Sequence, residues 1–390
     1  MAIGLNAHLS KRTAFSFIIV MGIVSLLVDL VYEGARSITG PYLSMLGASA
    51  AVVGFVAGFG ELAGYGLRYV SGVLSDRTKQ YWLITIAGYS MSVIAVPLLA
   101  LAGSWELAAV LIVTERAGKA IRTPAKDTML SHATSVVGHG RGFGIHEAMD
   151  QTGALIGPMI IAVVLFLGGS YQAGFALMVI PAIMALVVLL YARHYYPNPR
   201  GFEGSREIRT EGIPRSFWFY LMAVALVAAA FADFALMSFH FEKTGLVDMV
   251  YIPIFYAVAM GVDAIAALAF GRLYDKIGLP VLAMVSMISA FFAPLVFLGD
   301  IYMALIGTVL WGVGMGAQES VMRAAVAELV PPDKRSTGYG IFNLGYGVFW
   351  FIGSAIMGVL YDVSIVALVA FSFALQVASV PIFLRLKRSK

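Results

Sequence analysis

The hexapeptide Gly72-Val-Leu-Ser-Asp76-Arg77 and its near copy Gly271-Arg-Leu-Tyr-Asp275-Lys276 decide the fold of this chain. Each follows the second long apolar segment of its half of the sequence, so the repeat is one of position as well as of residue type. We therefore expect two equivalent halves built of membrane helices. Duplicated helical halves around a central cavity are the architecture of secondary transporters.

Composition places the chain in a lipid bilayer. Its 390 residues are 60% hydrophobic and 12% charged, with a mean hydropathy of +0.87, whereas soluble domains carry about 25% charged residues. The absence of cysteine excludes a disulfide framework and a thiolate metal site. The apolar run from Thr13 to Val31 is too long for a signal peptide, so it predicts a retained first helix.

A spanning helix needs about 20 mostly apolar residues, and twelve segments meet this requirement. They lie at 14–35, 48–72, 80–102, 105–123, 142–168, 171–194, 215–241, 249–271, 279–298, 301–326, 337–360 and 363–384. The long polar stretch between the sixth and seventh contains Pro197, Pro199, Gly201 and Gly204, which favour a linker. The predicted fold is all-α and integral to the membrane, with an N-terminal six-helix bundle at 1–195, a cytoplasmic linker at 196–214 and a C-terminal six-helix bundle at 215–390.

The distribution of Lys and Arg predicts the orientation. With the N-terminus in the cytoplasm, these residues concentrate in cytoplasmic segments, and only Arg36 and Lys243 fall toward the outer side. We expect a multi-pass protein of the cell inner (plasma) membrane with both termini cytoplasmic. The basic pI of about 9.1 reflects this bias, and nothing in the sequence indicates nucleic-acid binding.

A second repeat supports the duplication. Gly142-Phe-Gly144-Ile145 is matched by Gly338-Tyr-Gly340-Ile341, and Gly157 is matched by Gly353. With its twelve spans and two Gly-x-x-x-Asp-basic motifs, the chain resembles the major facilitator superfamily over its whole length. The resemblance implies a monomer that binds a small-molecule substrate.

The same resemblance implies a gating role for the hexapeptides. Asp76 and Asp275 would make ion pairs in one conformation and lose them in another. The gating residues are then Gly72, Asp76, Arg77, Gly271, Asp275 and Lys276. Thr78-Lys79-Gln80 departs from the Gly-Arg-Arg run that is usual in the family, and a solvated turn with ordinary topology charges is the alternative.

The predicted fifth helix carries the most function-specific pattern. Gly144, Gly153, Gly157 and Pro158 resemble the antiporter motif of the exporter branches of this superfamily. Such glycines make a smooth helix face, and the proline permits a bend that could seal against the 249–271 helix. Ile161 departs from the motif, and generic small-residue packing is the alternative.

Ionisable residues inside a bilayer are default functional candidates because they are costly unless paired or hydrated. Glu115, Lys119, Arg122 and Lys126 share one face of the fourth helix. Arg116 resembles the arginine of the superfamily motif Arg-x-x-Gln-Gly, in which Lys119 here replaces glutamine. That motif is tied to proton transfer in exporters.

Carboxylates on neighbouring helices can form ion pairs with these cations. The predicted proton sites are Asp29, Glu61, Glu115 and Asp150, since a carboxylate can load and release a proton as access alternates. The wider substrate and charge cluster comprises Glu33, Arg116, Lys119, Arg122, His146, Glu147, Asp233, Asp263, Gln318 and Glu319. Permanent structural pairs, such as Glu115 with Lys119, are the alternative.

The predicted C-terminal half is poorer in charge. Its aromatic residues could face an organic substrate, or equally lipid and core; they are Trp311, Phe231, Phe234, Tyr256, Phe342 and Tyr346.

No catalytic motif, phosphate-binding loop or metal-ligand spacing is present in the sequence. We expect a transporter rather than an enzyme, with no cofactor and no metal, driven by protons or another coupling ion. The predicted function is proton-coupled antiport that exports a small organic compound by alternating access. Two alternatives stay open: uptake or exchange of an anionic solute, such as an organic acid or phosphorylated compound, through the basic fourth helix, and a sensor that does not transport.

Overall fold

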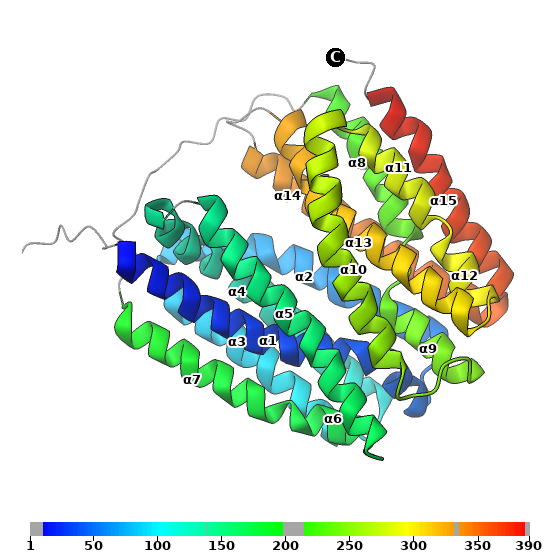
Figure 1. Ribbon diagram of the computed structural model, residues 1–390, viewed down its shortest axis with the longest axis horizontal. Helices are drawn as coiled ribbons and strands as arrows, with labels where there is room; N and C mark the ends of the chain where they lie inside the picture. The colour runs from blue at the N-terminus through cyan, green and yellow to red at the C-terminus, as the bar shows by residue number, and fades with distance from the viewer. Residues whose placement is uncertain (1–10, 138, 198–213, 331–334, 387–390) are drawn as a thin grey trace, which may run out of the picture.

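The computed structural model describes residues 11–137, 139–197, 214–330 and 335–386, and these residues form helices without any strand (Figure 1). The first group of helices is α1 (Lys11–Met45), α2 (Ala50–Thr78), α3 (Tyr81–Leu98) with the short turn η1 (Leu99–Leu101), α4 (Trp105–Val137), α5 (His139–Phe166), α6 (Tyr171–Leu177) and α7 (Val179–Tyr195). The second is α8 (Arg215–Ala230), α9 (Phe234–Thr244), α10 (Ile252–Ile277), α11 (Pro280–Ser289), α12 (Phe292–Leu298), α13 (Ile301–Leu329), α14 (Arg335–Val363) and α15 (Ile365–Leu386).

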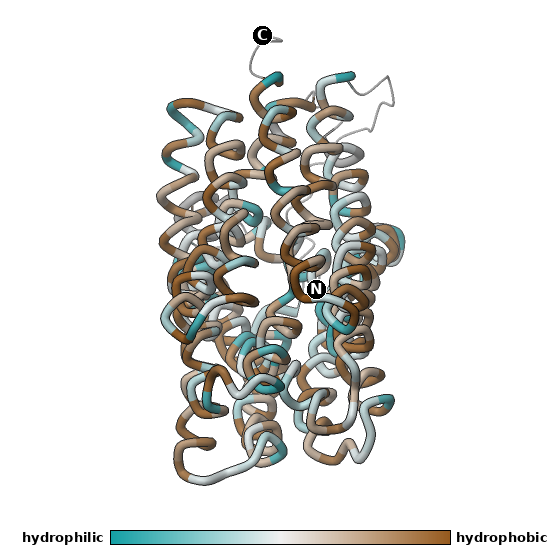
Figure 2. Tube along the Cα trace, turned by 90° about the vertical axis from the view of Figure 1, so that its right-hand side faces the viewer, coloured by the Kyte–Doolittle hydropathy of each residue, from teal (hydrophilic) through white to brown (hydrophobic). Residues whose placement is uncertain are grey.

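Each predicted span corresponds to one helix or to two consecutive helices, which confirms the all-α membrane fold. Within the described residues, eleven helical segments are long and apolar enough to cross a membrane. The helix outside this set is α4, which is 33 residues long but carries charged residues along its length. Hydrophobic residues dominate along the helices, as the brown stretches of Figure 2 show. The linker predicted at 196–214 lies almost entirely outside the described residues.

Two groups of helices meet at one end and separate at the other (Figure 1). In the first group α1 packs on α5, and α3 on α4; in the second α10 packs on α13, and α8 on α15. Between the groups, α2 packs on α14, α1 on α9, and α5 on α10. We call the end where α1 begins and α2 finishes the open end, and the opposite end the closed end.

Glycines let the helices approach at the closed end. A Cβ at Gly58 would lie 2.9 Å from Ser354 Cβ of α14, and one at Gly40 would clash with the α9 backbone at Ala235. The start of α2 is tied to α14 as well, because the Ala51 backbone N–H donates to Asp362 Oδ2 over 2.9 Å. Small residues at helix crossings allow this proximity in membranes.

The repeated hexapeptides form the last turns of α2 and α10, rather than the polar turns that we predicted to follow 72 and 271. Nothing between Gly72 and Thr78 breaks a helix, so α2 continues until Lys79 adopts a left-handed conformation with φ 55°. The second copy also precedes a residue of positive φ, Gly278, but with φ 69° and ψ −148° rather than a left-handed helical conformation.

The predicted span 215–241 is broken into α8 and α9. Phe231 is extended (φ −92°, ψ 110°), and Asp233 caps α9 by accepting from the Ala235 N–H over 3.0 Å. The carbonyls freed by the break are satisfied: Trp311 Nε1 donates to Ala232 O over 2.8 Å, and Ser372 Oγ to Ala230 O over 2.7 Å. Irregular backbone at membrane depth requires such internal partners.

Candidate functional site

A cavity of about 1020 Å³ lies between the two groups of helices. It reaches toward the open end, where Asp127 and Leu130 of α4 and Tyr339 of α14 line it. The contacts of α1 with α9 and of α2 with α14 close the opposite end. The structure is therefore a conformation with one-sided access.

Charged side chains of both signs line this cavity. The carboxylates are Asp29, Glu33, Glu61, Asp127, Glu147, Asp150, Asp263 and Glu319; the cations are Arg36, Arg68, Arg116, Lys119, Arg122, Lys126 and Arg323. All but Asp263, Glu319 and Arg323 come from α1, α2, α4 and α5. Such a wall suits a water-soluble, charged solute better than a lipophilic one, because buried charges need partners.

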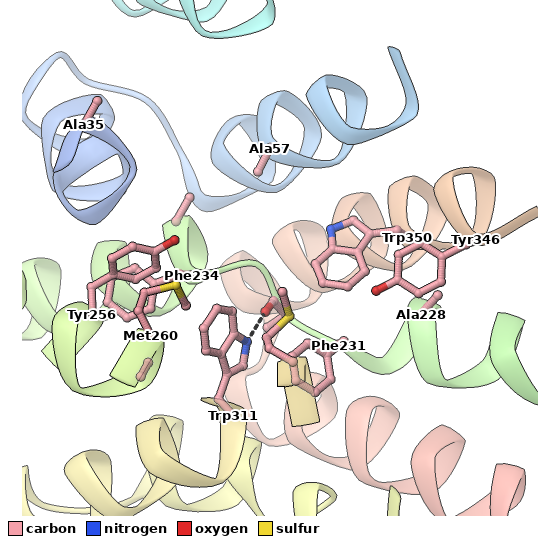
Figure 3. Packing of buried hydrophobic residues seen from close by; sticks show 14 of the residues in the cluster. Ala35, Ala57, Ala228, Phe231, Phe234, Tyr256, Met260, Trp311, Tyr346 and Trp350 are labelled. Atoms are coloured by element: carbon pink, nitrogen blue, oxygen red, sulfur yellow. Dashed lines mark hydrogen bonds between the residues drawn. The ribbon is translucent and has the colours of Figure 1, made fainter. Parts of the chain in front are cut away.

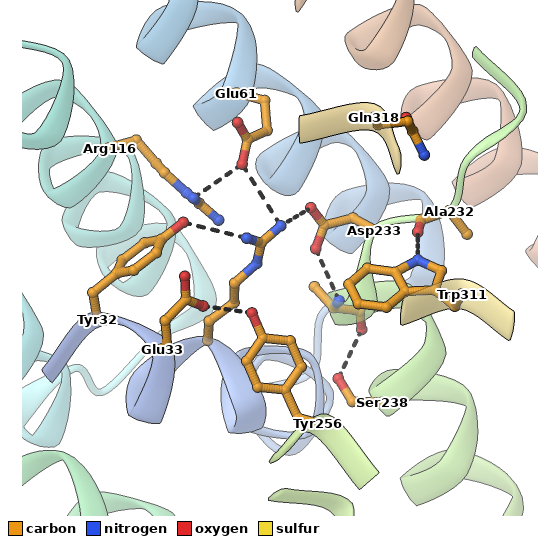
Figure 4. Close-up of polar contacts among 12 residues, drawn as sticks. Tyr32, Glu33, Glu61, Arg116, Ala232, Asp233, Ser238, Tyr256, Trp311 and Gln318 are labelled. Atoms are coloured by element: carbon orange, nitrogen blue, oxygen red, sulfur yellow. Dashed lines mark hydrogen bonds and ion pairs between the residues drawn. The ribbon is translucent and has the colours of Figure 1, made fainter. Parts of the chain in front are cut away.

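Arg36 of α1 joins the two groups of helices at the inner end of the cavity. Its Nη2 lies 3.0 Å from Asp233 Oδ2 at the start of α9 and 3.7 Å from Glu61 Oε1 of α2. Figure 4 shows Glu61, Asp233 and Arg116 around this network. Glu33, one turn earlier, accepts from the Tyr256 hydroxyl of α10 over 2.5 Å. The sequence placed Arg36 at the outer end of a helix finishing near 35, which was wrong because α1 continues to Met45.

Glu61 also binds Arg116 of α4, whose Nη1 lies 2.9 Å from Glu61 Oε1 (Figure 4). Arg116 lies 4.8 Å from the centre of the Tyr32 ring, and Lys119 lies 3.9 Å from it. Cations over an aromatic face are stabilised by its quadrupole. The ring of Tyr32 thus holds both cations at the wall of the cavity.

Glu115 lies apart from the main cavity. It lines a second, much smaller cavity of about 30 Å³ together with Arg116, and its Oε2 lies 3.7 Å from Arg116 Nε. The alternative pairing of Glu115 with Lys119 is therefore replaced by a pairing with Arg116. Glu115 of α4 and Asp150 of α5 were both predicted as proton sites, but the structure places them in different cavities.

A second ionic group lies nearer the open end. Asp29 of α1 and Asp150 of α5 are within hydrogen-bonding contact of each other, and Arg122 Nη2 lies 4.0 Å from Asp29 Oδ1. Arg122 is 3% exposed and lies 4.3 Å from the centre of the Tyr89 ring. His146, one turn before Asp150, is hydrogen-bonded to Ser25 over 2.9 Å. The structure thus brings two of the four predicted proton sites together.

The wall contributed by the second group is mainly aromatic and apolar. Trp311, Phe231 and Phe234 pack in the core rather than along the main cavity (Figure 3). Phe342 is likewise buried, and Tyr256 is engaged by Glu33. Among the aromatic residues proposed to face a substrate, Tyr346 lines the main cavity and donates to Gln318 Oε1 over 2.8 Å.

The residues of the predicted gating motif lie at the ends of α2 and α10. Arg77, Asp275 and Lys276 are exposed at the open end, and the side chain of Asp76 lies outside the described part of the chain. A Cβ at Gly72 would meet Pro124 of α4 at 3.7 Å, whereas Gly271 has open space around it. The predicted gate residues therefore border the open side.

The antiporter-like glycines face α1 rather than α10. A Cβ at Gly153 would lie 3.0 Å from the carbonyl carbon of Leu26, and one at Gly157 would lie 2.9 Å from Gly34 N. Gly144 has nothing within 4 Å, and Pro158 lies inside the uninterrupted α5. The smooth face thus serves packing within the first group of helices, while Leu155 of α5 approaches α10.

Five charged cavity residues were absent from the predicted site: Arg36, Arg68, Lys126, Asp127 and Arg323. Lys126 shares the charged face of α4 with Glu115 and Lys119, and Arg68 lies seven residues after Glu61 on one face of α2. These spacings did not by themselves show that the two side chains reach the cavity.

Comparison with known proteins agrees with this architecture. The sequence profile of the Major Facilitator Superfamily matches residues 13–354 and 264–389. An uncharacterized protein of Mycobacterium tuberculosis is 44% identical over 372 residues, covering 93% of this chain and 91% of that protein. An uncharacterized MFS-type transporter of Methanocaldococcus jannaschii is 24% identical over 358 residues, covering 88% of each chain.

Solved structures share the fold at low sequence identity. The nucleoside transporter NupG has a TM-score of 0.77 and 12% identity, covering 94% of this chain and 100% of that chain. A peptide transporter, POT, has a TM-score of 0.78 and 13% identity, covering 97% of each chain. From the profile match and the helical architecture together, the chain belongs to the Major Facilitator Superfamily and is a secondary transporter rather than an enzyme.

Proposed function

We propose that this protein is a proton-coupled antiporter that exports a small, charged organic solute by alternating access. The observation that carries the proposal is the contact between Asp29 and Asp150 in the wall of the cavity, with Arg122 beside Asp29. Two carboxyl groups this close favour sharing a proton over carrying two negative charges. A solute that alters their surroundings can therefore be exchanged for a proton.

The orientation follows from the charges at the two ends. Arg77, Arg193, Arg272 and Lys276 lie at helix ends on the open side, so we assign this side and both termini to the cytoplasm. The conformation described here is then inward-facing. Rocking of the two groups of helices would break the closed-end contacts and expose the same cavity to the outside.

The solute class follows from the lining of the cavity. Its carboxylates and cations favour a hydrophilic ion over an uncharged lipophilic compound. Among the proteins of similar fold, one is a nucleoside transporter and another a peptide transporter, and both solute types are polar. We propose that the working unit is a monomer, because the cavity lies within one chain.

Proton release from the purified protein tests the proposal. A library of organic ions is added to protein in weakly buffered detergent solution, and the pH of the solution is followed. We expect the wild-type protein to release protons when a solute binds. We expect the variants Asp29→Asn and Asp150→Asn to lose this proton release. Unchanged release in both variants would exclude the carboxyl pair, and solute uptake driven by an inside-alkaline gradient would contradict export.

Uptake or exchange of an anion is the second candidate, and the cations of α4 favour it. Arg116, Lys119, Arg122 and Lys126 all line the main cavity, where they can bind carboxylate or phosphate. Against it, Arg116 and Arg122 already lie beside Glu61 and Asp29. Solute counterflow that organic acids drive without any proton movement would favour this function over antiport.

A further inference from the structure

Asp263 of α10 is a buried carboxylate with one oxygen that has no partner among the described residues. It is 3% exposed, it lines the main cavity, and its Oδ1 has no hydrogen-bond partner among the described residues. A buried, unpaired carboxylate is costly inside a membrane protein, so such groups mark substrate or ion pathways. The mechanism proposed above does not use Asp263.

Further carboxylates surround this position. Glu319 of α13, Glu33 of α1 and Glu147 of α5 line the same cavity as Asp263, as does the cation Arg36 of α1. Gly316 lets α13 approach closely: a Cβ there would lie 2.8 Å from Asp263 Oδ1. Glu319, one turn further along α13, is exposed to the cavity.

The neighbouring charges are already engaged elsewhere. Glu33 accepts from Tyr256, and Arg36 is held by Asp233. No group of three or more described Asp, Glu, His or Cys residues is arranged to hold a metal ion. A ligand that brings both positive charge and N–H donors would fit this position.

We propose that Asp263 and Glu319 bind an ammonium group of the transported solute, which makes the substrate an amine-bearing organic compound. This inference rests on the proposed transport function and names the substrate class of the same cavity. An ammonium group donates up to three hydrogen bonds, and it would supply the partner that Asp263 Oδ1 lacks. Charge-assisted bonds of this kind are among the strongest in proteins.

Matched pairs of amines and alcohols test the inference on the full-length purified protein. The probes are putrescine with 1,4-butanediol and tyramine with tyrosol, and binding is measured by calorimetry and by thermal stabilisation. We expect the amine of at least one pair to bind at least about tenfold more tightly than its alcohol. Equal binding within both pairs, or no binding by either amine, would overturn the ammonium site.

Variants then assign the effect to the named residues. Asp263→Asn should lower amine affinity about tenfold or more, and Glu319→Gln, at the more exposed position, should lower it by a smaller factor. Wild-type affinity in both variants would overturn the assignment. Glu319→Gln also keeps the test decisive if Asp263→Asn does not fold.

A third variant separates this inference from the proposed function. Asp150→Asn should lose proton release while keeping the preference for amines over alcohols. Proton release that depends on Asp150 but not on the amine group would leave antiport intact and exclude the ammonium site. Amine binding that releases no proton in any form of the protein would exclude antiport and leave the ammonium site intact.

Discussion

The two sides of the cavity differ in chemistry although they share a scaffold. The wall from α1, α2, α4 and α5 carries most of the cavity's charged residues, while the wall from α10, α13 and α14 contributes Met260, Met315, Tyr346 and Trp350 beside its few charges. The hexapeptide lies at the end of α2 in the first group and at the end of α10 in the second. The two groups therefore share this motif at a helix end, whereas the side chains that line the cavity differ.

The two walls of the cavity have different roles. On the charged wall, ion pairs such as Arg116 with Glu61 can be rearranged when a proton or solute binds. Behind the other wall, Trp311 and Phe231 pack in the core, and Trp311 donates to the Ala232 carbonyl at the break between α8 and α9. Arg36 links the two sides, because it joins Glu61 of one to Asp233 of the other.

The largest effect is expected from breaking that link. Arg36→Ala leaves Glu61 and Asp233 with one cation fewer, and removal of one partner from a buried ion pair typically costs about 3–5 kcal/mol. We expect the closed end to open more often, with labelling at that end rising ~100-fold.

The natural absence of cysteine provides the measurement. A single Ala50→Cys, at a buried position of the α2–α14 contact, reports opening through its rate of reaction with a maleimide. Lys243→Ala is the matched control, since the exposed Lys243 lies 3.9 Å from Asp362 at the same end and should change the rate less than about threefold. Similar rates in the two variants would contradict a linking role for Arg36.

A pair of arginines compares the two walls directly. Arg122→Gln removes a buried cation beside Asp29 and should lower solute-driven proton transport in liposomes ~20-fold. Arg323→Gln, at an exposed position on α13, should lower it less than about threefold. Equal losses would show that the charges of both walls contribute alike.

The α5 glycines test how the charged wall is held together. Gly157→Ala introduces a Cβ within 2.9 Å of Gly34 N, which forces α1 and α5 apart and should destabilise the protein by about 1–3 kcal/mol. Gly144→Ala meets open space and should stay within about 0.5 kcal/mol of wild type. Unfolding in detergent measures both; equal stability would refute the packing role of Gly157.

The smallest effect is expected in the aromatic core of the second group. Phe342 is buried, with its ring 6.3 Å from that of Tyr220 and 6.0 Å from that of Tyr346. Phe342→Leu should lower stability by about 1 kcal/mol and leave the solute KM unchanged within about twofold. A changed choice of solute would place Phe342 at the substrate instead.

Much of the frame was predictable because hydrophobicity and helix length are local properties. Twelve apolar segments gave the helices, and Asp29 and Asp150 stood out as carboxylates within them. The break at residues 231–233 was missed because no proline or glycine marks it. Asp233 before Phe234 was the available signal, since aspartate is a preferred residue at helix starts.

What the sequence by itself determined is the membrane location, the helices and the asymmetry of charge, because each follows from the order of apolar and polar residues along the chain. Only the tertiary structure decided which charges meet. Arg36 reaches Asp233, Asp150 reaches Asp29, and Glu115 turns toward a separate small cavity. Among the described residues, Asp263 Oδ1 has no hydrogen-bond partner. The physical reason is that a side chain's neighbours depend on how helices far apart in the sequence rotate and cross, and close packing at glycines such as Gly40 and Gly157 sets those crossings.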